Sequence, residues 1–203
     1  MTRVLAIGDI HGCSIALDTL LAAVGPTPTD LIVTLGDYVH RGPDSAGVLD
    51  RLVDLHLTGR LIALRGNHEQ METEGSAWDT GEFTPSQWHF LEESLVDWYE
   101  TDTHLFVHAN AYPDMPLCDQ PEYMLRWEKL VDPLPHVSGK IMICGHTPQK
   151  SGVPLNLGHT ICIDTYAYGG GWLTCLDVKS GRYWQANQRG ETALGWIDDH
   201  LVE

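Results

Sequence analysis

Residues 3–12, RVLAIGDIHG, join a short apolar run to an acid and a histidine. The apolar run, residues 3–7, contains β-branched side chains and ends at a glycine, which predicts a buried strand. Apolar positions then recur at helical spacing over residues 14–24, which predicts a helix. This segment therefore predicts a strand–helix unit with Asp9 and His11 at the point where the strand ends.

Similar units follow along the chain, and together they predict an α/β fold. Further strands are expected at residues 31–35, 61–64, 104–107, 140–144, 160–163, 172–177 and 182–187. Further helices are expected at residues 44–57, 68–73, 85–96 and 122–131. This order, βαβαβ followed by helices and then by strands, predicts a two-sheet β-sandwich flanked by helices, in a single domain over residues 1–203.

The charge balance narrows the classes of partner. The chain has 203 residues, with 28 Asp and Glu against 12 Lys and Arg, and a formal net charge of −16. Such a charge repels nucleic acids and anionic membranes, which proteins bind mainly through Lys and Arg. A phosphate-bearing substrate must then be attracted locally, for example by bound cations.

Cysteine usage and the N-terminal sequence favour a cytoplasmic location. The five cysteines are odd in number, and no pair has the C-x-x-C spacing typical of zinc or redox sites. The chain reaches Asp9 after too few apolar residues for a signal-peptide core, and no apolar run approaches the ~20 residues of a membrane span. We therefore expect reduced thiols and no membrane partner.

One pattern recurs at the ends of the predicted strands. An apolar strand is followed at once by a side chain that commonly binds metals, in most cases next to a glycine. The side chains placed in this way are Asp9, His11, Asp37, Asn67, His108 and His146. Because ligands bind beyond the carboxyl ends of strands in α/β sheets, we expect these six side chains to meet at one edge.

This set mixes nitrogen and oxygen donors and contains no thiolate. It suits Mn, Fe, Zn or Co better than Ca²⁺, which prefers oxygen ligands. Six ligands exceed what one ion with an open position needs. We therefore expect two divalent ions about 3.5–4 Å apart, bridged by a carboxylate and able to activate a shared water.

As a set, these segments resemble the phosphoprotein phosphatase family of the calcineurin-like metallophosphoesterases, and in size its compact bacterial members. The matching residues are 8–12 (GDIHG), 36–42 (GDYVHRG), 66–69 (GNHE), His108 and 145–147 (GHT). The segments 163–164 and 169–173 also look like this family. The resemblance implies a β-sandwich flanked by helices, with the site at the edge of the sheets.

The resemblance also implies a role for each matching residue. The implied metal ligands are Asp9, His11 and the bridging Asp37 for the first ion, and Asn67, His108 and His146 for the second. His68 is implied as the general acid that protonates the leaving oxygen, and Arg41 as the residue that holds phosphate through its planar donors. A further phosphate-binding cation is expected near Trp127, with Lys129 as the first candidate and Arg126 as its rival.

Residue 40 departs from the family pattern. The family's second motif normally reads GDxxDRG, whereas here His40 stands at the second Asp. In the family, that Asp accepts a hydrogen bond from the general-acid histidine, here His68, and favours its protonated form. A neutral His40 accepts the same bond with less electrostatic support, and a protonated His40 opposes a protonated His68.

Three outcomes remain open for this pair. The enzyme works with a weaker or pH-shifted acid, another carboxylate such as Glu69 or Asp44 compensates, or the chain binds metals but is poorly active. The substitution His40→Asp is expected to raise turnover or shift its pH profile. If His40→Asp left the kinetics unchanged from about pH 5 to 9, residue 40 would have no part in catalysis.

Together these features predict a cytoplasmic, dimetal phosphomonoesterase, with Mn²⁺ as the favoured metal, that acts on phosphoserine, phosphothreonine or phosphotyrosine in phosphoproteins. Hydrolysis of diadenosine tetraphosphate is an alternative on the same fold, and it should need additional cations for the polyphosphate. A metal-binding module without catalysis is the other alternative. Substrate choice is expected to lie in the loops at 70–84 and 111–122.

Overall fold

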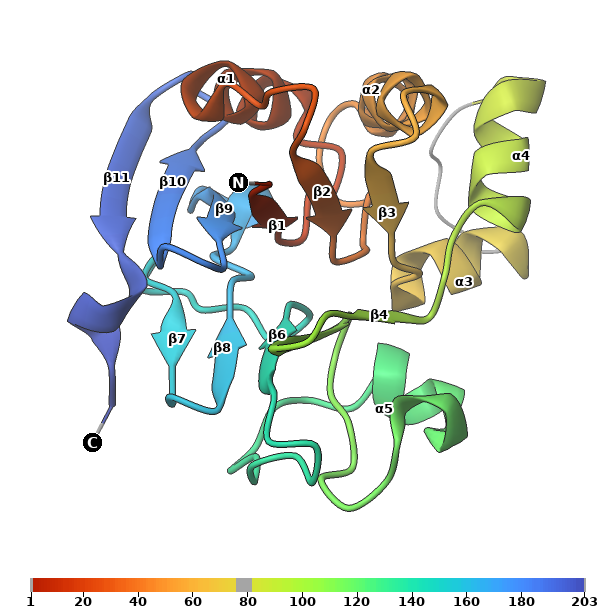
Figure 1. Cartoon of the computed structure of the whole chain (residues 1–203). Coiled ribbons are helices and arrows are strands. Elements are labelled where there is room, and N and C mark those ends of the chain that lie inside the picture. The colour runs from red at the N-terminus through yellow and green to blue at the C-terminus, as the bar shows by residue number, and fades with distance from the viewer. Residues whose placement is uncertain (1, 76–81, 203) are drawn as a thin grey trace.

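The computed structural model of the chain describes residues 2–75 and 82–202. Within them the strands form two mixed sheets that face each other, and helices cover the outer side of each (Figure 1). The predicted two-sheet sandwich flanked by helices is therefore confirmed. None of the helices in these ranges is long and apolar enough to span a bilayer.

The first sheet has the strand order β11-β10-β9-β1-β2-β3. Its strands are β1 (Val4–Ile7), β2 (Leu31–Thr34), β3 (Leu61–Ala63), β9 (Leu173–Asp177), β10 (Arg182–Ala186) and β11 (Thr192–Trp196). Strands β1, β2 and β3 are parallel, and β9 pairs with β1 in the antiparallel direction. The helices α1 (Ser14–Val24) and α2 (Ser45–Leu57) connect the three parallel strands and lie above them in Figure 1.

The second sheet has the order β4-β5-β6-β8-β7, and its central strands β5, β6 and β8 are parallel. Its strands are β4 (Trp98–Glu100), β5 (His104–Val107), β6 (Ile141–Cys144), β7 (Leu155–Asn156) and β8 (Thr160–Cys162). The remaining helices are α3 (Asn67–Thr73), α4 (Pro85–Glu93) and α5 (Glu122–Arg126), with 3₁₀ turns η1 (Leu117–Asp119), η2 (Ala167–Gly169) and η3 (Ile197–His200).

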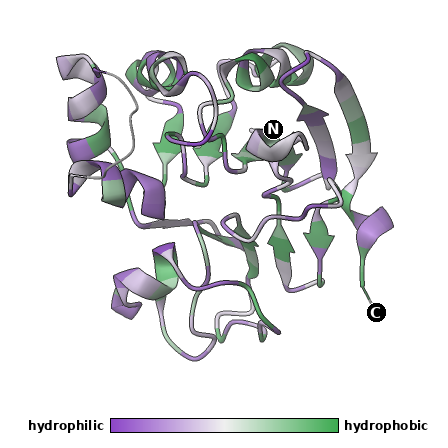
Figure 2. Ribbon diagram, turned by 180° about the vertical axis from the view of Figure 1, so that it is seen from behind, coloured by the Kyte–Doolittle hydropathy of each residue, from purple (hydrophilic) through white to green (hydrophobic). Residues whose placement is uncertain are grey.

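Alternation along the strands builds a core on each side of each sheet. In β1, Leu5 and Ile7 pack with α1 and α2, whereas Ala6 faces the second sheet. In β5, Phe106 points between the sheets, whereas its neighbours pack outward with residues of η1 and α5. Since both faces of these strands are buried, they carry apolar residues over much of their length, as the hydrophobic colour of several strands in Figure 2 shows.

Two predicted helices end earlier than expected because tertiary hydrogen bonds replace helical ones. The helix expected at 122–131 ends at Arg126, since the Trp127 carbonyl accepts from His146 and the Leu130 N–H donates to Thr147. The helix expected at 85–96 ends at Glu93, because Val96 pairs with the end of β3. Strands β4, β7 and β11 lie outside all the predicted elements, and the first two are only two or three residues long.

The arrangement brings the carboxyl ends of five strands to one region. Strands β1, β2 and β3 of the first sheet and β5 and β6 of the second all end there, and each is followed within four residues by one or two of the predicted ligands. The fold therefore gathers segments that lie more than a hundred residues apart in sequence.

Candidate active site

The six predicted ligands converge at these strand ends. His108 Nε2 lies 3.1 Å from Asn67 Oδ1 and 3.2 Å from His146 Nδ1, and His146 Nδ1 lies 3.0 Å from Asn67 Oδ1. Asp37 lies between this group and His11, with Oδ1 3.5 Å from His108 Nε2 and Oδ2 3.4 Å from His11 Nε2. Both carboxylate oxygens of Asp9 accept the His146 N–H at 3.1 Å.

Each of the three histidines is oriented by a backbone carbonyl. The ring nitrogen Nδ1 of His11 faces the Val39 carbonyl at 3.2 Å, and Nδ1 of His108 faces the Leu35 carbonyl at 2.7 Å. Nε2 of His146 faces the Trp127 carbonyl at 3.0 Å. Since a carbonyl only accepts, the facing nitrogen carries the hydrogen and the other keeps its lone pair for the cluster, as metal-binding histidines require.

Three buried carboxylates crowd the same space. Burial, followed by the charges of Asp164 and Asp37, raises the pKa of Asp9. Burial raises the pKa of Asp37 to about 8 and that of Asp164 to about 6. Oδ2 of Asp164 is buried and has no hydrogen-bond partner among the described residues. A divalent cation would relieve this crowding.

Burial also acts on the histidines, in the opposite direction. It lowers the pKa of His11, that of His108 to about 4 and that of His146 to about 3. Neutral imidazole is the form that binds metals. Two groups of side chains have donor atoms within 4.8 Å of one another, namely His11, Asp37 and His68, and Asp37, His108 and His146. The donor set thus fits two divalent ions, and Asp37 is common to both groups.

The backbone around the cluster adopts conformations that are rare for non-glycine residues. A left-handed φ between 46° and 69° occurs at His11, Asp37, His40, Arg41 and His146. Such strain concentrates at functional sites. The motif glycines make room for the carboxylates, because a Cβ atom on Gly145 would lie 2.0 Å from Asp9 Oδ1, and one on Gly66 would lie 2.3 Å from Asp37 Oδ1.

Glu69 fixes the turn that carries Asp37. Its carboxylate accepts four backbone N–H groups at 2.7–3.3 Å, those of Asp37, Tyr38, Val39 and Gly66. Burial and then the charge of Asp37 raise the pKa of Glu69 to about 8, whereas these N–H donors oppose the rise. Asp44 has a different task, since it caps α2 by accepting the Gly47 N–H at 2.8 Å. Both carboxylates are therefore engaged by backbone N–H groups.

The His40 side chain pairs instead with Glu72 on α3. Nε2 of His40 lies 2.6 Å from Oε2 of Glu72, and Nδ1 of His40 lies 2.8 Å from Nδ1 of His68. Arg41 Nε donates to Nε2 of His68 at 3.4 Å. Burial, and after it the Arg41 charge, lower the pKa of His68 to about 3.

A pocket of about 270 Å³ opens above the cluster. Its lining includes the cluster residues His11, Asp37, Asn67 and His146, the predicted His68, Arg41 and Lys129, and further Lys150, Asp164 and Tyr168. The Arg41 guanidinium stacks on the Tyr168 ring at 4.7 Å from its centroid, and that ring contacts His11 edge-on. Three cationic side chains, Arg41, Lys129 and Lys150, therefore line a pocket that is also lined by the carboxylates of Asp37 and Asp164.

Arg126, the rival candidate for phosphate binding, lies elsewhere. Its guanidinium is buried and pairs with Asp97 at 2.5 Å and with Glu122 at 3.1 Å, and it is absent from the lining of the pocket. The pair with Asp97 ties α5 to the residue before β4, and the pair with Glu122 lies within α5. Lys129, by contrast, lines the pocket as expected.

Sequence reasoning assigned no role to four residues of the site: Glu72, Lys150, Asp164 and Tyr168. A signal existed for Asp164, because it follows an apolar strand in the same manner as the other ligands. The other three have no strand-end pattern. Their positions follow from tertiary packing alone.

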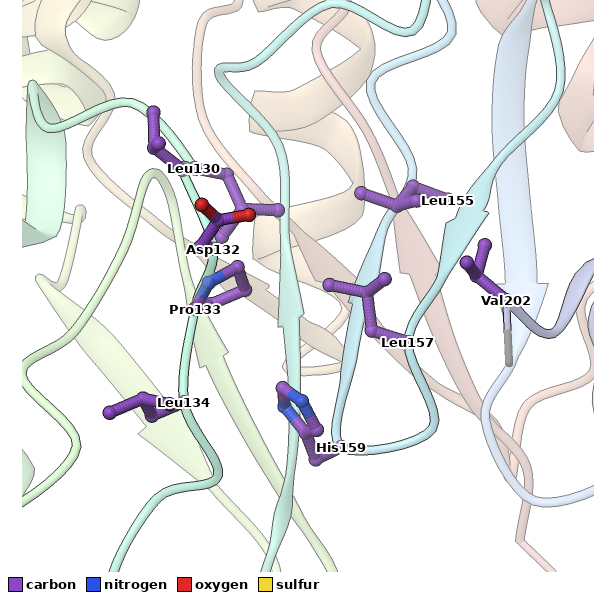
Figure 3. Close-up of a pocket in the computed structure, with 9 residues that line it drawn as sticks. Leu130, Asp132, Pro133, Leu134, Leu155, Leu157, His159 and Val202 are labelled. Atoms are coloured by element: carbon purple, nitrogen blue, oxygen red, sulfur yellow. The ribbon is translucent and has the colours of Figure 1, made fainter.

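A larger hollow, of about 680 Å³, is lined by residues on and around β7 and by the segment 130–134 (Figure 3). Its walls are mostly apolar and come from the segment 130–134, from β7 and its following turn, and from Val202. It contains Asp132 and His159 but none of the six ligands. The smaller, polar pocket is therefore the better candidate for chemistry.

The chain is similar to known phosphoesterases. The sequence profile described as Calcineurin-like phosphoesterase matches residues 2–173. Serine/threonine-protein phosphatase 1 of Salmonella typhimurium is 29% identical over 87% of this chain and 92% of its own length. The symmetrical bis(5'-nucleosyl)-tetraphosphatase of an Acidovorax species is 48% identical, but over only 31% of this chain and 22% of its own length.

A solved structure is similar over nearly the whole chain. It is presented as a candidate diadenosine tetraphosphatase, and it superposes with a TM-score of 0.72 at 25% identity. The match covers 96% of this chain and 94% of that one.

Proposed function

The chain belongs to the calcineurin-like phosphoesterase family, and on this basis we propose that it is a dimetal-dependent phosphoprotein phosphatase. Its substrates are phosphomonoesters of serine, threonine or tyrosine side chains. The proposal includes Mn²⁺ as the working metal and a cytoplasmic location, in keeping with five free thiols. It also takes residues 1–203 as one domain, because both sheets contribute to the site.

The observation that carries the proposal is the size of the pocket over the ligand cluster. Its volume of about 270 Å³ lies below the ~300–1,000 Å³ of most small-molecule sites. A phosphoryl group and the first atoms of an amino-acid side chain fit such a volume, while the peptide remains outside. Similarity to a serine/threonine phosphatase over 92% of that protein's length supports the same substrate class.

The family uses divalent metal ions, and in this proposal the chain's six converging ligands hold two of them. Asp9, His11 and Asp37 would hold one ion, and Asn67, His108 and His146 would hold the other, with Asp37 close enough to serve both. When bound, the ions activate water for attack on phosphorus and neutralise phosphoryl charge. Asp164 adds a further oxygen donor to the floor of the pocket.

The other side chains act on the substrate. Arg41 binds two phosphoryl oxygens through its planar donors, and its stacking on Tyr168 limits the orientations of the guanidinium. Lys129 attracts the dianion at the mouth of the pocket. His68 lines the pocket and is proposed to protonate the leaving oxygen as the ester bond breaks, which requires that Nε2, an acceptor of the Arg41 Nε–H in the structure, first takes up a proton.

Hydrolysis of a dinucleoside polyphosphate is the second candidate, and two observations favour it. The third pocket cation, Lys150, supplies the additional charge that a polyphosphate needs. The structure presented as a candidate diadenosine tetraphosphatase is similar over 96% of the chain. A dinucleotide would place its nucleosides outside the pocket.

One assay separates the two candidates. The protein with added Mn²⁺ is given a phosphoseryl peptide, a phosphotyrosyl peptide and diadenosine tetraphosphate at equal concentrations. We expect a higher kcat/KM for at least one phosphopeptide than for the dinucleotide. Preferential cleavage of diadenosine tetraphosphate would replace the proposal with the second candidate, and a lack of hydrolysis of all three would overturn both.

A further inference from the structure

We propose that the buried thiol of Cys162 is a positioning residue for the metal ligand His146. It acts through the backbone of the turn 145–147, which carries that ligand. This inference rests on the dimetal function proposed above. It gives a purpose to a free, buried cysteine that the sequence indicates only as a reduced thiol.

The register of the second sheet places Cys162 beside the ligand turn. Cys162 is the last residue of β8 and lies opposite Cys144, the last residue of β6, and both pack in the same apolar cluster. The chain leaves β6 directly into the segment 145–147. Because paired residues of neighbouring strands point to the same face of a sheet, the Cys162 side chain lies next to the start of this turn.

The turn at His146 is strained. The Thr147 N–H donates to the Gly145 carbonyl at 2.6 Å, which closes a three-residue turn with His146 at its centre. The His146 φ of 61° has the sign of the rarer form of this turn, which is unfavourable for residues other than glycine. Such a conformation persists only where its surroundings hold it. The position of the His146 imidazole therefore depends on the contacts that hold this turn.

The Cys162 thiol contacts both carbonyls that flank His146. Its Sγ lies 3.4 Å from the Gly145 oxygen and 3.4 Å from the Thr147 oxygen. A thiol has one hydrogen and is a weak donor, so it bonds one carbonyl at a time or shares its hydrogen between the two. In both cases one buried side chain connects the two ends of the turn.

Gln149 adds a second contact to the same turn. Its Nε2 donates to the Thr147 carbonyl at 2.7 Å and lies 3.7 Å from Cys162 Sγ, which accepts. Its own N–H donates to the Asp164 carbonyl at 2.8 Å. The thiol and the amide thus form one hydrogen-bonded unit at the Thr147 carbonyl. Cys162 is fully buried in this unit, and Gln149 is half-buried.

A small movement of this turn reaches the metal site directly. His146 Nδ1 lies 3.0 Å from Asn67 Oδ1 and 3.2 Å from His108 Nε2. Metal ligands tolerate errors of only about 0.2 Å in distance, and removal of a group that orients a ligand typically costs about 10- to 100-fold in metal affinity. Loss of the thiol should therefore weaken the ion assigned to Asn67, His108 and His146 more than the other ion.

Titration with Mn²⁺ alone tests this role by calorimetry. We expect the wild type to bind two ions, and Cys162→Ala to weaken one of them about 10- to 100-fold while the other stays within about threefold. Cys162→Ser keeps a hydroxyl donor with a shorter reach, and it should recover part of the loss. Wild-type affinity for both ions in a folded Cys162→Ala protein would overturn the inference.

Cys175→Ala is the matched control. It removes another buried thiol, from β9 in the first sheet, where Cys175 packs in the core cluster that includes α1. Both Mn²⁺ affinities should stay within about twofold of wild type. Equal losses in Cys162→Ala and Cys175→Ala would assign the effect to loosening of the core, and would overturn the positioning role.

Gln149→Ala keeps the test decisive where Cys162→Ala does not fold. It removes the amide donor from the same turn without opening the core, and it should weaken the same ion by about threefold or more. Unchanged affinity in that variant would then overturn the inference. A wild type that does not bind two Mn²⁺ ions overturns the dimetal function and this inference together. Because the affinities are measured without substrate, a failure of hydrolysis overturns the proposed function and leaves this result as it stands.

Discussion

At the scale of single residues, Arg41 is the cation most tightly built into the site. Its guanidinium stacks on Tyr168, its Nε donates to His68, and its backbone adopts a φ of 69°. These contacts hold the planar donors over the ligand cluster before any substrate arrives. Preorganisation of this kind lowers the entropy lost when a phosphoryl group binds.

Replacement of Arg41 should therefore damage catalysis more than stability. Hydrogen bonds to charged groups contribute about 1.5–3 kcal/mol, so we expect Arg41→Ala to lower kcat/KM for a phosphopeptide about 10- to 150-fold. Arg41→Lys should recover only part of the loss, because a point charge lacks the planar fork. Arg60→Ala, in the segment between α2 and β3, is the matched control. An Arg41→Ala protein with wild-type kcat/KM would remove Arg41 from the phosphate-binding set.

Single residues also show what a sequence can reveal about a site. The convergence of the six predicted ligands could be anticipated because each lies within four residues of the end of a strand, so its position is fixed by local geometry and a general rule of α/β sheets. Glu72 and Tyr168 were not, since each reaches the site from a segment that carries no strand-end signal. Glu69 was expected as a possible partner for His40. Its carboxylate instead accepts hydrogen bonds from four backbone N–H groups, which the sequence alone does not predict.

At the scale of elements, the site depends on the mutual registration of the parallel strands. Leu5 of β1 lies opposite Ile32 of β2, and Ile32 lies opposite Leu61 of β3. At their amino ends, β1 and β2 are tied by an ion pair. Arg3 Nη2 lies 2.5 Å from Asp30 Oδ2, and the same carboxylate accepts the Thr27 N–H at 2.7 Å. This register sets the relative positions of the strand ends at the site.

Removal of this ion pair gives a pH-dependent loss of stability. The Arg3 hydrogen bond holds the pKa of Asp30 well below its usual value of about 3.9. A lowered carboxyl pKa stabilises the fold above the unfolded pKa, and the stabilisation is lost as pH falls towards the folded pKa. We expect Asp30→Asn to lower the unfolding free energy by about 1–3 kcal/mol at pH 7, and by progressively less below about pH 4.

An exposed ion pair provides the control for this measurement. Asp18 and Arg51 form a two-point contact at 2.9 and 3.0 Å, but both side chains are nearly half exposed. Urea unfolding of Asp18→Asn should therefore give a change below about 1 kcal/mol. A loss at Asp30→Asn that stays constant from pH 7 to about pH 2 would contradict the account.

The helices could be predicted where the spacing of apolar residues determines their extent. The ends of α1 and α2 lie within one residue of expectation, since both helices bury a clear apolar face. The helix expected at 122–131 was five residues too long, because His146 and Thr147 take over the hydrogen bonds of its last turn. Such competition between distant segments leaves no mark on the local sequence.

At the scale of the whole molecule, bound cations and the fold should support each other. Three buried carboxylates repel one another at the junction of the two sheets, and that repulsion opposes folding of the metal-free chain. Divalent ions that bind the folded state alone add stability in proportion to the logarithm of their concentration. The net charge of −16 favours cation uptake further.

Thermal unfolding measures this coupling. With Mn²⁺ at about 100 times its dissociation constant, the gain is about 2.7 kcal/mol, which corresponds to a rise of about 5–10 °C in Tm for a chain of this size. EDTA should reverse the rise. His108→Gln should lose most of it, whereas His159→Gln, which alters a histidine in the apolar hollow, should keep it. An equal shift in both variants would indicate non-specific binding.

The central claim is that six side chains from five strand ends hold two cations in contact with one shared carboxylate. Electron paramagnetic resonance of the Mn²⁺-loaded protein tests it most directly, because two bridged ions couple magnetically and isolated ions do not. We expect the spectrum of an exchange-coupled pair, replaced by that of isolated ions or lost in Asp37→Asn. A wild-type spectrum that contains only isolated Mn²⁺, at any metal content, would contradict the account.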